Sequence, residues 1–329
     1  FLVGEYYLAE VATALIWSLA GMGLMLLIGH SGQVSLGHAA FLAIGAYTDV
    51  ALMNVGLPFL LAFPLAGLAA GLFGALIAIP AVRMSGIYLA IATLALFVIV
   101  EELVILLEPV TGGIGGIAAP SIEVLGISFD RYAALPNFYW LTLGVVALVT
   151  LGYANLLRSP TGRSFLAVRD SEVSARALGI NVARTKTLAF GLSCGITGLA
   201  GALMGHFIGF FNYELFSIFI SINLVLVVVI GGLGFIQGAF CGAILISLVP
   251  QALAILRDEF RAVSGIDLSA YPGLDTLVFA LILVGFIVYE PMGIYGRWLK
   301  IRTFFELFPL YRRAMFRRQK SYLKTERMR

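Results

Sequence analysis

Long apolar runs separated by short polar turns constrain this chain more than any other feature of its sequence. A helix needs about 20 apolar residues to cross a bilayer, and the runs are close to that length. The chain is 60% hydrophobic and 12% charged, whereas soluble domains are about 25% charged. A soluble fold of 329 residues could not bury so much apolar surface. The sequence therefore predicts an all-α polytopic membrane helix bundle of about eight or nine spans, near residues 8–28, 36–53, 58–79, 86–107, 138–157, 187–210, 217–233, 238–256 and 272–290.

The positive charge is concentrated in two segments. Of 21 Lys and Arg residues, six lie in 158–186 and eleven in 297–329. Cytoplasmic segments carry the excess of Lys and Arg, so we expect both segments to be cytoplasmic, with four crossings between them. Counting back places Arg83 inside and 117–136 outside. Phe1 then faces outward, which predicts a further crossing or leading segment upstream.

This charge pattern divides the chain into a transmembrane domain, 1–296, and a basic cytoplasmic tail, 297–329. Within the first domain, 158–186 forms a cytoplasmic loop. Residues 163–178 contain no Gly or Pro, and Gly179 follows as a natural C-cap. We predict one short amphipathic helix here. It could lie on anionic lipid headgroups, or it could dock a cytoplasmic partner.

The segment "GRSFLAVRDSEVSARALGINVARTKTLAFGLSCGITGLAGAL" resembles the cytoplasmic loop of the LivM-type permeases of branched-chain amino acid ABC importers. Four other stretches resemble this family in the same order: "GHSGQVSLGHAAFLAIGAY", "TGGIGGI", "GGLGFIQGAFCGA" and "EPMGIYG". The resemblance covers nearly the whole chain. It implies that the loop is a coupling helix that sits in a cleft of an ATPase subunit.

The resemblance also implies the functional residues and the partners. The general loop reads E-A-A-x-x-x-G, and the distance from Glu172 to Gly179 is one residue longer here. The positions that couple to the ATPase are Arg169, Asp170, Glu172, Ala175 and Gly179. The implied partners are a homologous LivH-type permease, two cytoplasmic ABC ATPase subunits and a periplasmic substrate-binding protein, in the lipid bilayer of the bacterial inner membrane. No cofactor and no nucleic acid are implied, and ATP would be bound by partner subunits, because this sequence has no G-x-x-x-x-G-K-[ST] loop.

The stretch "GHSGQVSLGHAAF" at 29–41 interrupts the apolar sequence with Gly and Ser. Broken helices in transporters expose backbone N–H groups to anionic substrate groups. We expect Ser35 to cap a helix that begins at Leu36, and we take Ser35, Gly37 and His38 as candidate lining of the substrate pathway. The alternative is an ordinary turn between two spans.

Other features have plainer interpretations. His30 and His38 have no third ligand nearby, so no metal site is predicted. His206 is expected to be packed and hydrogen-bonded, and Asp49 is one of several acids near predicted span ends. A stripe of glycines along one span favours close helix packing. Its members are Gly191, Gly195, Gly198, Gly201, Gly205 and Gly209.

Competing functions remain open at this stage. The chain is expected to be a non-catalytic transport subunit for Leu, Ile and Val. Relatives that carry urea, short amides or other amino acids are an alternative. A secondary transporter is less favoured, because no basic residue lies at the centre of any predicted span. An intramembrane enzyme would need a motif such as H-E-x-x-H or G-x-S-x-G, and the sequence has neither.

Overall fold

The computed structural model describes residues 4–264, 274–289 and 293–306, apart from 83, 85 and 125. Predictions about Phe1, Arg83, the first two residues of the span at 272–290 and the tail beyond 306 lie outside these residues. The helices are α1 (Glu5–Met25), the π-helical η1 (Leu26–His30), α2 (His38–Asn54), α3 (Phe59–Ala81), α4 (Ile87–Leu106), α5 (Glu108–Thr111), η2 (Gly113–Gly115), α6 (Arg131–Arg158), α7 (Pro160–Asp170), α8 (Glu172–Ala177), α9 (Val182–Ile208), η3 (Tyr213–Phe216), α10 (Ile218–Gly231), α11 (Ile236–Ser264), α12 (Leu274–Tyr289) and α13 (Gly293–Glu306).

The all-α prediction is confirmed, because each of the nine apolar runs forms a helix. An apolar run in lipid must satisfy its own backbone hydrogen bonds, and a helix does so within the segment. Seven helices in the described residues are long and apolar enough to cross a membrane. The other two, α2 with 17 residues and α12 with 16, are shorter. The total of eight or nine spans therefore stays a prediction.

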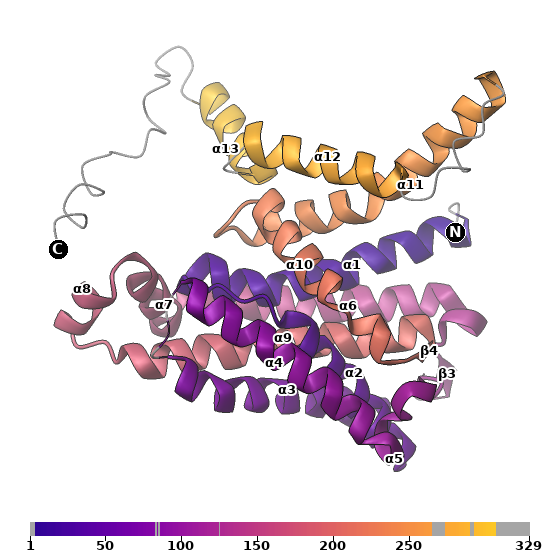
Figure 1. Ribbon diagram of the computed structural model, residues 1–329, viewed down its shortest axis with the longest axis horizontal. Coiled ribbons are helices and arrows are strands. Elements are labelled where there is room, and N and C mark those ends of the chain that lie inside the picture. Colours follow the sequence, from indigo (N-terminus) through magenta and orange to yellow (C-terminus); the bar gives the residue numbers. More distant parts are fainter. Residues whose placement is uncertain are drawn as a thin grey trace.

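Helix α9 lies at the centre of the bundle and packs against α1, α2 and α3 (Figure 1). Its glycines allow two neighbouring helices, α3 and α2, to approach closely. A Cβ at Gly195 would lie 3.2 Å from the carbonyl oxygen of Gly67 in α3. A Cβ at Gly201 would collide with the carbonyl of Leu42 in α2. The predicted close packing is confirmed, and it joins α9 to two helices at once.

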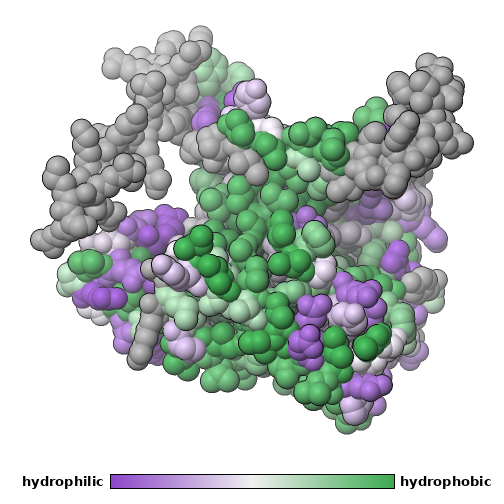
Figure 2. Space-filling model, viewed as in Figure 1, coloured by the Kyte–Doolittle hydropathy of each residue, from purple (hydrophilic) through white to green (hydrophobic). Residues whose placement is uncertain are grey.

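The short helix α2 is largely enclosed by the other helices. Eleven of its residues are buried, including Phe41, Leu42 and Asp49. By contrast, α3 turns a row of leucines outward, among them Leu68 and Leu72. Apolar side chains dominate the surface around the middle of the molecule (Figure 2). This is the surface expected where lipid surrounds a bundle.

Polar elements gather at the two ends of the bundle. Helices α7 and α8 form one end, and short strands lie at the other (Figure 1). There β1 (Ile117–Ala118) pairs with β4 (Phe210–Phe211), and β2 (Glu123–Val124) pairs with β3 (Ile127–Ser128). Both pairs are antiparallel. The charged loop and the glycine-rich loop at 111–117 are therefore at opposite ends, as the sequence predicts.

Candidate functional site

The predicted break after the first span is present, with a different geometry from the one expected. The last turn of α1 widens into the π-helix η1, and the chain is then non-helical from Gly32 to Gly37. Gly32 has a φ of 72°, which favours glycine. The next helix begins at His38 with Gly37 as its N-cap and no side-chain cap, so the expected cap by Ser35 at Leu36 was wrong.

Ser35 does not cap the helix because its hydroxyl binds the ring of His38. The Oγ of Ser35 lies 2.8 Å from Nδ1 of His38, and Nε2 of His38 lies 2.9 Å from Oγ of Ser193 in α9. Ser193 donates its only proton to the carbonyl of Gly23 at 2.6 Å. It must therefore accept from Nε2–H, so Nδ1 is the acceptor and Ser35 donates to it. This chain of bonds is complete with a neutral imidazole.

All three candidate pathway residues are buried in the protein. Ser35 and His38 are 0% exposed. A Cβ at Gly37 would collide with the carbonyl of Thr93, because the start of α2 presses against α4. The side chain of Thr93 also accepts the amide of Leu36 at 3.0 Å. The structure brings these residues together in a buried polar cluster at the start of α2.

The charged loop forms two helices, so the prediction of one helix over 163–178 was wrong. Ser171 has an extended backbone, with φ −163° and ψ 114°, between α7 and α8. Its hydroxyl accepts the amide of Ser174, which is an N-cap for α8. A serine side chain can compete in this way with the helical backbone and restart the helix. At the far end, Gly179 has a φ of 80°, and Ile180 N–H bonds the carbonyl of Ala175, which is a Schellman C-cap.

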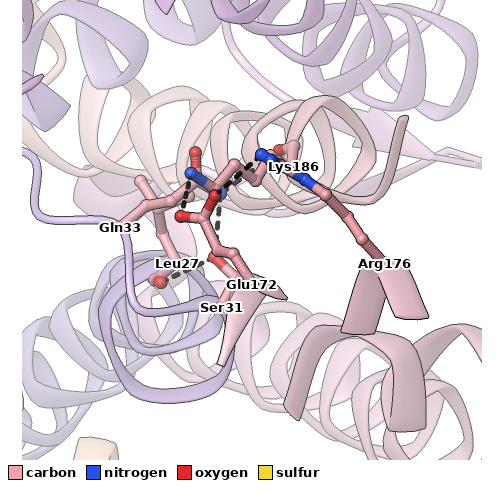
Figure 3. A network of polar contacts seen from close by, with 6 residues as sticks. All are labelled: Leu27, Ser31, Gln33, Glu172, Arg176 and Lys186. Atoms are coloured by element: carbon pink, nitrogen blue, oxygen red, sulfur yellow. Dashed lines mark hydrogen bonds and ion pairs between the residues drawn. The ribbon is translucent and has the colours of Figure 1, made fainter. Parts of the chain in front are cut away.

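The break turns Glu172 towards the membrane bundle (Figure 3). Its carboxylate pairs with Nζ of Lys186 at 2.5 Å and with Arg176 at 3.5 Å. The Lys186 side chain is only 7% exposed. Burying a cation is costly unless it is paired, so Glu172 is what makes this position tolerable for lysine.

The same contact region reaches the break in the first helix. Gln33 donates to the carbonyl of Lys186 at 3.2 Å and to Oγ of Ser31 at 2.9 Å. Ser31 in turn donates to the carbonyl of Leu27 in η1 at 2.8 Å. Figure 3 shows this path from α8 through the start of α9 to the π-helix. Charged loop and helix break are thus one connected polar unit.

Arg169 makes a second connection from the loop to the break. Its guanidinium donates to the carbonyl of Gly29 in η1 at 2.8 Å and pairs with Asp170 at 3.0 Å. A Cβ at Gly32 would lie 3.1 Å from the Arg169 side chain. The backbone of Gly32 therefore lies against this side chain.

The five predicted coupling residues therefore divide into two groups. Arg169, Glu172 and Ala175 face the permease, and Ala175 is 1% exposed in a small cluster with Val168 and Val182. Asp170 and Gly179 face outward. Sequence reasoning missed Lys186 and Gln33 as members of the site, together with two exposed apolar residues, Val173 and Leu178. One signal in the sequence pointed to Lys186, since this lysine lies directly before an apolar span.

No metal centre emerges from the part of the chain that the structure describes. Among these residues, no group of three or more His, Cys, Asp or Glu side chains could hold a metal ion. What the arrangement offers instead is a rigid polar contact between a surface loop and an unwound helix end. Such a contact can pass a displacement of the loop into the bundle.

Comparison with known proteins identifies the family of this chain. A family model described as branched-chain amino acid transport system / permease component matches residues 6–289. The chain is 33% identical over 309 residues to the high-affinity branched-chain amino acid transport system permease protein LivM of Escherichia coli (strain K12), covering 87% of this chain and 69% of that protein. It is 27% identical to the LivH permease protein of the same organism, covering 85% of this chain and 91% of that protein. It is also 27% identical to a probable LivM permease of Methanocaldococcus jannaschii, over 71% of this chain and 67% of that protein. No solved structure matches.

Proposed function

Because this chain belongs to the family of branched-chain amino acid transport permeases, we propose that it is one of two permease subunits of an ABC importer for Leu, Ile and Val. The observation that carries the proposal is the charged loop. It is tied to the break after α1 directly by Arg169, and by Glu172 through Lys186 and Gln33. Likeness to LivM and to LivH supports a homologous LivH-type partner in the same complex.

The other subunits of the importer would be separate chains. Two cytoplasmic ATPase subunits would bind and hydrolyse ATP, and an extracytoplasmic binding protein would deliver the substrate. The permease subunit itself would carry out no chemistry. The direct test is radiolabelled leucine uptake into vesicles that contain all these subunits. Uptake that needs no ATP would favour a secondary transporter, and uptake of urea or short amides in place of leucine would favour the alternative substrates.

We infer that the ATPase contacts the outer surface of α8. Val173 is 77% exposed and Leu178 is 79% exposed, in a loop whose other exposed residues are mostly charged or polar. Burying two apolar side chains of this size contributes roughly 3 kcal/mol or more. We expect Val173→Ser with Leu178→Ser to weaken ATPase binding at least tenfold, measured by titration of ATPase subunits onto permeases in nanodiscs. Val55→Ser is the control, because Val55 is 80% exposed and far from this loop. Equal affinity of the double variant and the control would contradict the assignment.

The orientation follows from the charge distribution and is open to a labelling test. A cysteine introduced at Ser171, in the charged loop, should react with impermeant thiol reagents only from the cytoplasmic side. A cysteine at Ser121, which is exposed at the opposite end, should react only from outside. The basic tail would place the C-terminus in the cytoplasm, where a cysteine at Ser321 should behave like that at Ser171. Labelling of Ser171 from outside intact cells would reverse the topology.

We propose that the substrate path runs beside the unwound segment at Ser35, Gly37 and His38. Passage there would require α4 to move away from Gly37. During that movement the buried polar cluster would keep the unwound segment in its conformation. Ser35→Ala leaves Nδ1 of His38 without its donor, which costs about 1–3 kcal/mol. We expect a several-fold lower maximal uptake rate with unchanged apparent affinity, since the binding protein sets that affinity. Ser247→Ala is the control, because the hydroxyl of Ser247 has no partner among the described residues. Equal rates in the two variants would remove Ser35 from the path.

A further inference from the structure

A second buried polar site lies at the end of the bundle opposite the charged loop. Nε2 of His206, near the end of α9, lies 2.6 Å from Oδ2 of Asp49 in α2. The two side chains are 2% and 0% exposed. The other carboxylate oxygen, Oδ1, has no hydrogen-bond partner among the described residues. The ring of Phe59 packs edge-on against His206 and closes one side of the pair.

The burial of this pair limits its charge. A single uncompensated charge at such a depth would cost several kcal/mol, so the pair must be neutral as a whole. A neutral pair with the acid proton on Oδ1 of Asp49 would leave that buried O–H without an acceptor among the described residues, so two neutral forms remain. Either an imidazolium pairs with a carboxylate, or a protonated Asp49 donates to Nε2 of a neutral ring. In both forms the second ring nitrogen, Nδ1, carries a proton.

His206 also lines a cavity of about 300 Å³. The cavity lies where the end of α9 meets the segment around β1 and β4. Its lining residues include the acidic Asp130, the polar Ser121 and the apolar Ile122, Phe129 and Ile208. Nδ1 of His206 has no bonded partner among the described residues, so this N–H donor is available to a ligand in the cavity.

We propose that this cavity is a low-affinity binding site for an α-amino acid zwitterion. The substrate carboxylate accepts the proton of His206 Nδ1, the ammonium group faces Asp130, and the side chain packs on Ile122 and Phe129. The site supplies one donor, one anion and an apolar wall, which are the three features of such a ligand. This inference rests on the proposed function for its place on the substrate's route.

The charge balance of the site explains why the affinity would be low. Asp49 neutralises His206, so the carboxylate of the substrate meets one hydrogen-bond donor and no net positive charge. A hydrogen bond to a charged group contributes about 1.5–3 kcal/mol. Weak binding suits a transport intermediate, because a substrate held tightly here would not move on.

The test is equilibrium binding of tritiated leucine and tritiated alanine to the complete importer in nanodiscs, without binding protein and without ATP. Two competitors test the carboxylate and the ammonium group of the ligand separately. 4-Methylpentanoate has the carboxylate and lacks the ammonium group, whereas isoamylamine has the ammonium group and lacks the carboxylate. We expect both to displace leucine from the wild-type protein. Failure of 4-methylpentanoate to compete would overturn the role of His206 without any variant.

Two variants should give crossed results. Asp49→Leu with His206→Phe replaces the buried pair by apolar side chains of similar size, which is often neutral for stability. This change should weaken leucine and 4-methylpentanoate about tenfold and leave isoamylamine unchanged. Asp130→Asn should weaken leucine and isoamylamine and leave 4-methylpentanoate unchanged. The proposal is overturned if neither labelled amino acid binds the wild-type complex, or if the double variant binds leucine as the wild type does.

A separate measurement distinguishes this proposal from the proposed function. Leucine uptake by the wild-type importer with its binding protein tests the function alone. An importer that takes up leucine but shows no crossed pattern has the proposed function without this site. A crossed pattern with alanine, in a complex that does not import leucine, supports the site and contradicts the substrate assignment.

Discussion

Reversing the charge at Lys186 should reduce ATP-driven leucine uptake at least tenfold, and reversing Glu172 in the same molecule should restore much of it. Lys186→Glu places two carboxylates where the wild-type ion pair is 2.5 Å long. The site is buried, because the side chain of Lys186 is only 7% exposed. Breaking a buried ion pair costs about 3–5 kcal/mol, less here because Glu172 is 37% exposed. A factor of ten corresponds to about 1.4 kcal/mol. The exchange Glu172→Lys with Lys186→Glu keeps the attraction with its direction reversed.

The comparison needs three measurements and one matched control. Leucine uptake, the ATPase rate and the yield of assembled complex should be measured for the two single variants and the exchange. Arg184→Glu is the control, since Arg184 is exposed two residues away and undergoes the same change of charge. We expect the single variants to hydrolyse ATP with little uptake. If the exchange is no better than the sum of the single variants, the pair does not carry the coupling.

Adding one methyl group at Gly201 should destabilise the bundle more than a methyl at Gly195, another member of the glycine stripe of α9. The new Cβ would collide with the backbone of Leu42 in α2, and backbone cannot move aside as a side chain can. Overpacking of this kind costs about 1–3 kcal/mol. We expect Gly201→Ala to lower the melting temperature of the detergent-solubilised protein by several degrees, read from the loss of the monodisperse peak on size-exclusion chromatography.

Two other glycines provide the controls. Gly195→Ala meets the carbonyl of Gly67 at 3.2 Å, so a small shift between α9 and α3 can relieve it. Gly144→Ala in α6 meets no atom within 4 Å in the described part of the chain. It should raise stability by roughly 0.5–1 kcal/mol, because alanine favours a helix interior over glycine. Melting temperatures in the order Gly144→Ala, Gly195→Ala, Gly201→Ala, from high to low, are expected. Identical values for the last two would mean that α2 and α9 are not in close backbone contact.

The sequence alone determined the features that depend on nearby residues. Each apolar run became a helix because its hydrogen bonds close within the run. Most of the charged segment stayed outside the apolar core, because seven charged side chains lie within 163–186. Gly179 ended α8 because only glycine adopts a φ of 80° without strain. The family resemblance was confirmed for the same reason, since motifs are local strings of residues.

Tertiary structure decided everything that depends on residues far apart in the chain. Periodicity could not place a break at Ser171, because it registers neither the cap that Ser171 makes on α8 nor the pairing of Glu172 with Lys186. The pairing of His206 with Asp49 joins residues 157 positions apart, and composition gives no sign of it. Gly191 and Gly201 share one face of α9, yet they contact α3 and α2 respectively. A buried charge or a close backbone contact takes its energy from whichever partner the fold brings to it, and only the folded chain determines that partner.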